Sequence, residues 1–236
     1  MRIVFTSNGI LTPYAGMNNR AVSLANHIIN SNKEVSFFVF LNTRNDIDPK
    51  IKVIEYSPLK IGSQSIIFRT TERFRISKYL FSKLVSRQLN RMEPDVVCVD
   101  HQPMDWYINE AKKHARFNVV YTYHSDVDPN LYSGKMREIM EKYRRHSLEV
   151  AKDADLTIAV SNFVRKQLAE NGINSTVVYN GVDTERFKPR IFNYSRYKMS
   201  APTIIYVGRI LPFKGVDLLI KSFKKVKEEI PDAVGL

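Results

Sequence analysis

The sequence predicts an α/β protein in which a parallel β-sheet carries helices on both faces. Short runs rich in β-branched residues alternate with longer stretches of helical period, which is typical of this class. The runs 96–99 and 119–121 are apolar throughout, as strands buried on both faces require. The predicted strands are 2–7, 34–41, 52–56, 95–100, 118–123, 156–160, 176–179 and 203–207, and the predicted helices are 17–31, 66–92, 104–115, 131–152, 161–171 and 214–229.

The pattern of strand and helix breaks between about residues 181 and 202, where neither period continues. We therefore predict a Rossmann-like N-terminal domain over 1–185, a linker over 186–200 and the start of a second Rossmann-like domain over 201–236. One strand and one helix cannot bury a core by themselves, so the second domain is expected to be incomplete.

Composition describes an ordinary globular protein, because 44% of the 236 residues are hydrophobic and 25% are charged. No apolar run approaches the length of a transmembrane helix, and the N-terminus lacks a signal-peptide pattern. The single cysteine, Cys98, lies in an apolar run and is interpreted as a buried small hydrophobe. We expect a cytoplasmic protein that could lie peripherally on the inner face of the membrane.

The net charge of +12 calls for an anionic partner or surface, and the predicted helix 66–92 carries much of the excess. Its apolar side chains fall on one face, and its cations fall opposite within an arc of roughly 80°. This face is either a solvated basic surface or a contact with anionic lipid head groups. Nucleic acid is ranked last, because the aromatic side chains point away from the basic arc. The basic residues are Arg69, Arg73, Lys83, Arg87 and Arg91.

Candidate site residues stand where the predicted strands end, because open α/β sheets bind ligands beyond the carboxyl ends of their strands. Gly16 opens a helix whose free N–H groups favour an anion. His101 follows the fourth strand and His124 the fifth, so both are expected to face one cleft, together with Asn18 and Asp126. Asp126 could bind a divalent cation with Asp128, but the sequence lacks a third oxygen-rich cluster. We therefore expect no metal and no cofactor.

The strand exit of the second domain carries two cations, Arg209 and Lys214, five positions apart around a strand-to-helix turn. Arginine can grip a phosphate as a fork and lysine as a movable point charge, so the pair is suited to a diphosphate. The alternative is that both are ordinary solvated cations.

Three motifs occur in the later part of the sequence: residues 160–162, Val-Ser-Asn; residues 178–189, with Asn-Gly-Val-Asp followed by Phe and Pro; and residues 206–220, with Gly-Arg…Lys-Gly. Together they resemble the family 4 retaining glycosyltransferases of the GT-B fold. The resemblance implies a transferase that moves a sugar from a nucleotide-diphosphate sugar to a hydroxyl acceptor, with retention of configuration and without a metal. The implied acceptor is a glycan or a lipid-linked molecule.

The resemblance also implies roles for individual residues. His124 matches the histidine near the transferred sugar, where it would orient a hydroxyl or a developing charge. Arg209 and Lys214 match the pair that neutralises the donor diphosphate. Gly16 matches the second glycine of a paired-glycine loop near the donor phosphate, and Ala15 replaces the first.

The family's two glutamates that contact the donor do not occur before residue 236, so the sequence is expected to be truncated within the donor domain and inactive alone. The alternative function is a noncatalytic Rossmann-like module that binds an anion or a membrane surface through its basic helix. Loss of nucleotide diphosphate binding on substitution of Arg209 and Lys214 would favour the enzyme.

Overall fold

The computed structural model describes residues 1–6, 10–11, 16–39, 41–55, 75–100, 104–114, 116–125, 128–189, 202–208, 210 and 214–235. The chain divides into two compact units, which are described separately. The first unit comprises Met1–Pro129 and Glu138–Gly181, and the second comprises Asn130–Arg137 and Val182–Leu236.

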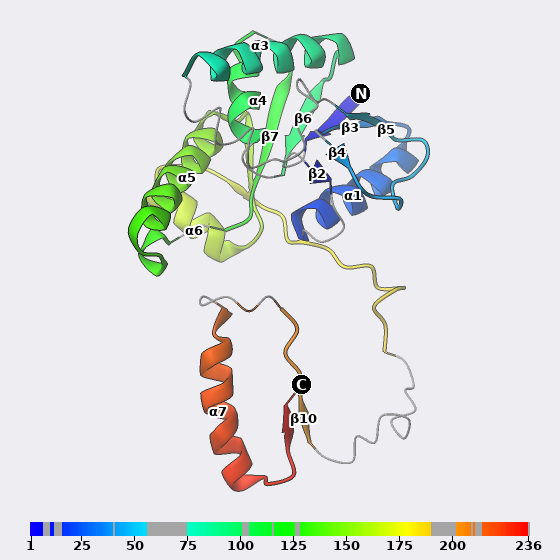
Figure 1. Ribbon diagram of the computed structural model, residues 1–236. Coiled ribbons are helices and arrows are strands. Elements are labelled where there is room, and N and C mark those ends of the chain that lie inside the picture. The colour runs from blue at the N-terminus through cyan, green and yellow to red at the C-terminus, as the bar shows by residue number, and fades with distance from the viewer. Residues whose placement is uncertain are drawn as a thin grey trace. The chain divides into compact units, whose positions relative to one another are not determined.

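The first unit contains a seven-stranded sheet in which every neighbouring pair of strands is parallel (Figure 1). The strand order is β5-β3-β1-β6-β7-β8-β9. The strands are β1 (Arg2–Thr6), β3 (Glu34–Val39), β5 (Lys52–Glu55), β6 (Val96–Val99), β7 (Asn118–Tyr123), β8 (Leu156–Ala159) and β9 (Thr176–Val177). This is the Rossmann-like α/β fold class that the sequence predicts.

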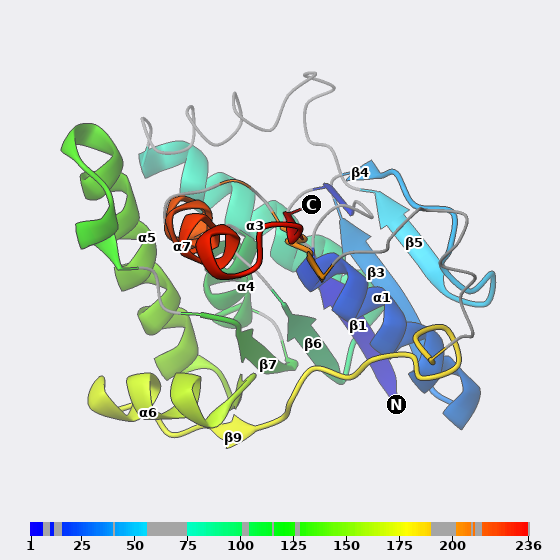
Figure 2. The same ribbon diagram turned by 90° about the horizontal axis from the view of Figure 1, so that it is seen from below.

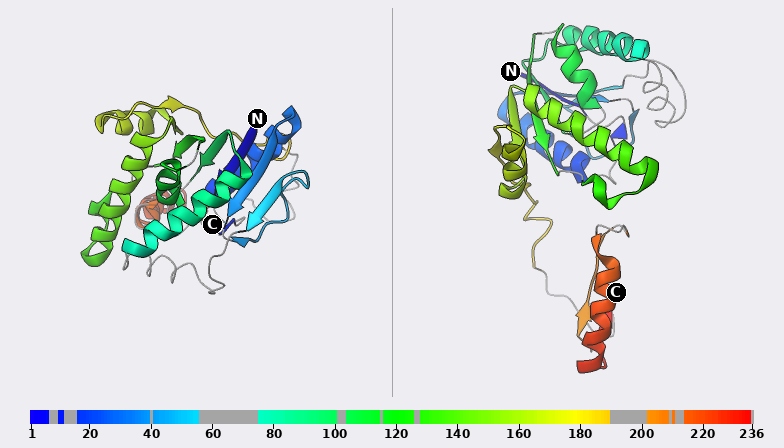
Figure 3. Two further views of the ribbon diagram at one scale, coloured as in Figure 1. Left: turned by 90° about the horizontal axis from the view of Figure 1, so that it is seen from above. Right: turned by 90° about the vertical axis from the view of Figure 1, so that its left-hand side faces the viewer.

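Helices cover both faces of this sheet. The helical elements between the strands are α1 (Gly16–Ile28) with the 3₁₀ turn η1 (Ile29–Ser31), α3 (Arg75–Met92), α4 (Met104–Lys112), the 3₁₀ turn η2 (Pro129–Leu131), α5 (Gly134–Asp153) and α6 (Asn162–Glu170), of which residues 130–137 belong to the second unit. Figure 2 shows α1 on one face of the strands, and the left view of Figure 3 shows α3 on the other. Helix α1 packs into one apolar cluster, whereas α3, α4, α5 and α6 contribute to the second.

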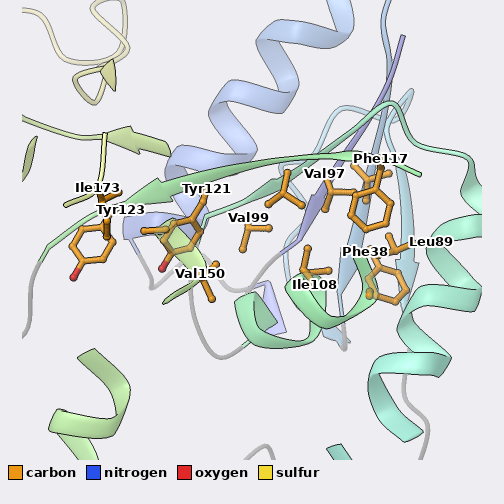
Figure 4. Close-up of a cluster of buried hydrophobic side chains, with 14 of the residues drawn as sticks. Phe38, Leu89, Val97, Val99, Ile108, Phe117, Tyr121, Tyr123, Val150 and Ile173 are labelled. Carbon is orange, nitrogen blue, oxygen red and sulfur yellow. The ribbon is translucent and has the colours of Figure 1, made fainter. Parts of the chain in front are cut away.

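The strands have continuous apolar runs because consecutive side chains point to opposite faces of the sheet, and each face packs against its own hydrophobic core. In β1, Val4 packs with α3 and α4, whereas Ile3 and Phe5 pack with α1. The larger core is shown in Figure 4, whose labelled side chains are Phe38, Leu89, Val97, Val99, Ile108, Phe117, Tyr121, Tyr123, Val150 and Ile173. Burial on both faces therefore fixes the sheet between two layers of helices.

Two details differ from the sequence prediction. Residues 34–41 do not form one strand, because β4 (Leu41–Asn42) pairs instead with β2 (Ile10–Leu11) in a separate parallel ribbon. Leu11 is completely buried, and its carbonyl accepts a hydrogen bond from the Thr43 backbone N–H. Both contacts stabilise the pairing of β2 with β4. The predicted helical residues 66–74 lie outside the described residues.

The described part of the second unit contains β10 (Thr203–Ile204), α7 (Val216–Glu229) and β11 (Val234–Gly235), with β10 and β11 parallel. Strand β10 is shorter than the predicted 203–207 because β11 pairs with only two of its residues. Apolar side chains of this unit remain exposed, including Val207, Ile210, Leu218 and Ile220. The domain boundaries at 185 and 200 stay predictions.

Within the described ranges, no helix combines the length and the apolar character needed to cross a membrane.

Two leucines on α3 provide a matched test of the larger core. Leu89 is 0% exposed and Leu84 is 44% exposed. Leu89→Ala should lower the free energy of unfolding by about 2–5 kcal/mol, because it leaves a cavity. Leu84→Ala should cost less than about 1 kcal/mol. Urea unfolding followed by circular dichroism measures both, and equal losses would contradict this packing of α3.

Candidate active site

The strand order reverses direction between β1 and β6. From β1 the chain proceeds to β3 and β5 on one side, and it then returns to β6 and proceeds to β7, β8 and β9 on the other. Connections at such a switch point leave in opposite directions, and ligands of open α/β sheets bind in the crevice at the carboxyl ends of the strands there. The residues that follow β6 and β7 are therefore the first place to look for chemistry.

A buried carboxylate stands directly after β6. Asp100 Oδ1 accepts a hydrogen bond from Arg20 Nη1 at 2.7 Å and lies 3.2 Å from His124 Nε2. Arg20 Nη1 also donates to Thr122 Oγ1 at 3.4 Å. Since β6 and β7 are in register with Val99 opposite Tyr121, the residues beyond both strand ends stay adjacent. We call Arg20, Asp100, Thr122 and His124 the Asp100 cluster.

Three elements bring the Asp100 cluster together. Arg20 comes from the second turn of α1, Asp100 follows β6, and Thr122 and His124 lie at the end of β7. The side chains of Asp100, Arg20 and His124 are 5%, 14% and 15% exposed. Because solvent is largely excluded, these polar contacts are held more firmly than contacts of surface side chains.

Burial and pairing act in opposite senses on Asp100. Burial by itself raises the pKa of this carboxyl, because it penalises the charged form. The hydrogen bond with His124 and the charge of Arg20 outweigh burial and hold the pKa below its ordinary value. Asp100 is therefore an ionised carboxylate at neutral pH. Its second oxygen, Oδ2, is buried and has no hydrogen-bond partner among the described residues.

Cys98 is two residues upstream of Asp100 and forms no disulfide. Burial, and next the nearby charge of Asp100, raise the pKa of its thiol to about 12. A thiol that stays protonated is a poor nucleophile, so the interpretation of Cys98 as a small packed side chain fits the structure.

The structure describes some of the other predicted site residues in the first unit. Gly16 begins α1, and a Cβ placed there would meet no atom within 4 Å. Asn18, in the first turn of α1, is buried. His101 and Asp126 lie outside the described residues, so the predicted meeting of His101 with His124 is not tested. Among the residues that are described, no group of three metal-ligating side chains occurs.

The predicted diphosphate residues fall in the second unit. Lys214 is exposed and lies two residues before α7. Gly215 between them has a φ of 67°, a left-handed conformation that favours glycine at this helix start. Arg209 lies outside the described residues. The convergence of Lys214 and Arg209 stays a prediction.

Three of the five predicted basic residues lie on the described part of α3. Val85 and Leu89 are buried in the core, whereas Lys83, Arg87 and Arg91 are exposed and succeed one another at helical spacing. Together with Ser86, Asn90 and His114 they line an open hollow of about 550 Å³. Arg69 and Arg73 lie outside the described residues.

Sequence reasoning missed Asp100 and Arg20. Asp100 could have been found from the sequence, because it is the last residue of the fourth predicted strand and ligands bind at strand ends. The residue predicted for the site at that strand end is its neighbour, His101. Arg20 gives no comparable signal, since a cation in an amphipathic helix is usually solvated.

Comparison with known proteins gives a family match. The model of Glycosyltransferase Family 4 matches residues 14–186. A GDP-mannose-dependent alpha-(1-6)-phosphatidylinositol monomannoside mannosyltransferase of Mycolicibacterium smegmatis is 31% identical over 91 residues, which are 35% of this chain and 24% of that protein. An uncharacterised glycosyltransferase of Methanocaldococcus jannaschii is 36% identical over 75 residues, 31% of this chain and 19% of that protein.

Solved structures share the fold at low sequence identity. HepE of Anabaena, in complex with UDP and glucose, has a TM-score of 0.69 and 18% identity, and covers 100% of this chain. Sucrose-phosphate synthase of Thermosynechococcus elongatus has a TM-score of 0.73 and 16% identity, and covers 99%. The chain spans 60% of the first structure and 61% of the second.

The pairing of Arg20 with Asp100 predicts a pH-dependent loss of stability. Arg20→Met should lower the free energy of unfolding by about 3 kcal/mol at neutral pH, because it leaves a buried carboxylate without its cation. The folded pKa of Asp100 is depressed, so its stabilisation is present above the unfolded pKa of about 3.9 and is lost as pH falls through the lower folded pKa. The difference between wild type and variant should therefore shrink below about pH 4.

Urea unfolding at several pH values measures this difference. Arg145→Met is the control, because Arg145 is exposed on α5. A constant difference between wild type and Arg20→Met down to the acid range would contradict the role given to Asp100.

Proposed function

The chain belongs to Glycosyltransferase Family 4, and from this premise we propose that it acts in transferring a sugar from a nucleotide-diphosphate sugar to a hydroxyl acceptor. The observation that carries the proposal is the Asp100 cluster. A histidine is held by a buried carboxylate at the carboxyl edge of the sheet, beside the switch point. Such a side chain is suited to contact a sugar or an acceptor in the crevice, and its surroundings keep it in a fixed orientation.

The donor diphosphate is assigned to the second unit. Lys214 lies just before the N-terminus of α7, where free backbone N–H groups and the helix dipole favour an anion. Arg209 would supply the second cation. The solved structure of HepE, which has a similar fold, holds UDP and glucose, and this supports a nucleotide-sugar donor for the present chain. Gly16 is proposed to approach the donor phosphate, and the open space above it supports this role.

Retention of configuration and metal independence are further parts of the proposal. The leaving nucleotide carries its negative charge on the diphosphate, and neutralisation of that charge lowers the barrier to its departure. A guanidinium and an ammonium would supply the positive charge that a divalent cation supplies in metal-dependent enzymes.

The basic face of α3 is proposed to rest on an anionic membrane surface. Lys83, Arg87 and Arg91 are exposed while the apolar face of the helix is used in the core, so the helix would lie on the surface without inserting. A lipid-linked acceptor would be presented at such a surface. The M. smegmatis relative is by name a phosphatidylinositol monomannoside mannosyltransferase, which supports an acceptor of this kind.

Binding of UDP, GDP and ADP to this chain tests the donor site, with isothermal titration as the measurement. At least one of them should bind saturably. Lys214→Met should weaken that binding by about tenfold or more, because a charge-assisted hydrogen bond contributes about 1.5–3 kcal/mol. Lys225→Met is the control, since Lys225 is an exposed lysine on the same unit. Equal effects of Lys214→Met and Lys225→Met on that binding would contradict the assignment of the diphosphate to Lys214.

Vesicle co-sedimentation tests the membrane surface. Vesicles containing phosphatidylglycerol should retain the protein better than vesicles of phosphatidylcholine alone. Arg87→Ser with Arg91→Ser should weaken partitioning by about thirtyfold, at about 1 kcal/mol for each cation. The control removes the same charge from α5 through Lys142→Ser with Arg145→Ser. Similar losses for the two double variants would argue against a specific basic face.

A further inference from the structure

The contact between His124 and Asp100 determines which ring nitrogen carries a proton. Asp100 is ionised, and a carboxylate can only accept hydrogen bonds. The 3.2 Å contact between His124 Nε2 and Asp100 Oδ1 is therefore a hydrogen bond that the ring donates. A neutral imidazole has one N–H, so Nδ1 then keeps its lone pair.

Arg20 favours the ionised form of Asp100, in which the carboxylate accepts a hydrogen bond from the His124 ring. Its guanidinium donates to the same oxygen, Oδ1, at 2.7 Å, and it is permanently charged. The ion pair stabilises the ionised form of Asp100, so the carboxyl does not become a donor to the ring. Arg20 is itself bound to Thr122 Oγ1 on β7, the strand that leads to His124. Cation, carboxylate and imidazole are thus connected across three elements of the fold.

A second histidine–carboxylate contact in the chain is exposed to solvent. His146 Nδ1 lies 3.1 Å from Glu149 Oε2 on α5, but the two side chains are 40% and 58% exposed. Water competes for both groups there, so this contact is weaker than a buried one. Burial distinguishes the His124 contact from an ordinary surface pair.

We propose that Asp100 is a positioning residue that keeps Nε2–H of His124 on its Oδ1 and so fixes the neutral form of the ring as the Nε2–H tautomer, in which Nδ1 accepts a hydrogen bond from a hydroxyl of the sugar or the acceptor. This inference rests on the proposed function, and it decides between the two roles that the resemblance leaves open for His124. The neutral ring receives an O–H, whereas orienting a developing negative charge would require a ring N–H that points toward it. His124 thereby helps to select a substrate by its hydroxyl group.

Long-range ¹H–¹⁵N NMR of the labelled chain near neutral pH tests this assignment, because the nitrogen shifts of the two tautomers differ. The His124 ring should give the Nε2–H pattern. A His124 ring with Nδ1–H, or with both nitrogens protonated, would overturn the proposal.

Asp100→Leu isolates the role of the carboxylate. It removes the acceptor of the His124 Nε2–H, so the Nε2–H population should fall toward the mixture of an unconstrained ring and the Nδ1–H population should rise. Glu149→Leu is the matched control and should leave the His124 pattern unchanged. An unchanged His124 tautomer in folded Asp100→Leu would show that Asp100 does not set it.

The tautomer of His124 can be measured whether or not a nucleotide binds. If Asp100→Leu fails to fold, the wild-type spectrum alone decides the tautomer. If Lys214→Met and Lys225→Met affect nucleotide binding equally but His124 is the Nε2–H tautomer, the proposed donor site fails and the positioning role of Asp100 stands. If a nucleotide binds and the tautomer differs, only the positioning role fails.

Discussion

Burial of one carboxylate organises the carboxyl edge of the sheet. An ionised side chain removed from water costs several kcal/mol unless it is paired and hydrogen-bonded. The side chain of Asp100 is 5% exposed, and it obtains its partners from α1 and β7. The helix that begins beside β1 and the strand that leads to His124 are therefore tied to the end of β6. The orientation of His124 at this edge therefore depends on the contacts that Asp100 makes.

The opposite edge of the same sheet shows why exposure matters. Arg2 pairs with Glu34 at 3.2 Å and with Glu93 at 2.7 Å, which are contacts as short as those of Asp100. All three side chains are 45% or more exposed, so water and salt screen them. The amino edge thus has ion pairs without a fixed electrostatic environment. Among the described ion pairs of these two edges, those of Asp100 are the ones from which solvent is largely excluded, and this favours a fixed orientation of the His124 ring.

The sequence predicted the features that local pattern controls. Apolar runs such as Val96–Val99 identified strands buried on both faces, and the spacing of Val85 and Leu89 identified the inner face of α3. The strand ends located His124. Pairing of Arg20 with Asp100 could not be predicted, because the two are 80 positions apart. Their contact depends on which way α1 is turned over the sheet, and packing decides that orientation. The split between β3 and β4 likewise depends on a ribbon partner distant in sequence.

Charge is distributed differently in the two units, and this has a consequence for the proposed transfer. In the Asp100 cluster the charge of Arg20 offsets that of Asp100. The proposed tautomer of His124 would add a hydrogen-bond acceptor there, which suits recognition of a hydroxyl more than of a phosphate. The charge of a diphosphate must then be met elsewhere, and Lys214 and Arg209 of the second unit have the required sign. Recognition of the hydroxyl and neutralisation of the leaving group are accordingly assigned to different units of the chain.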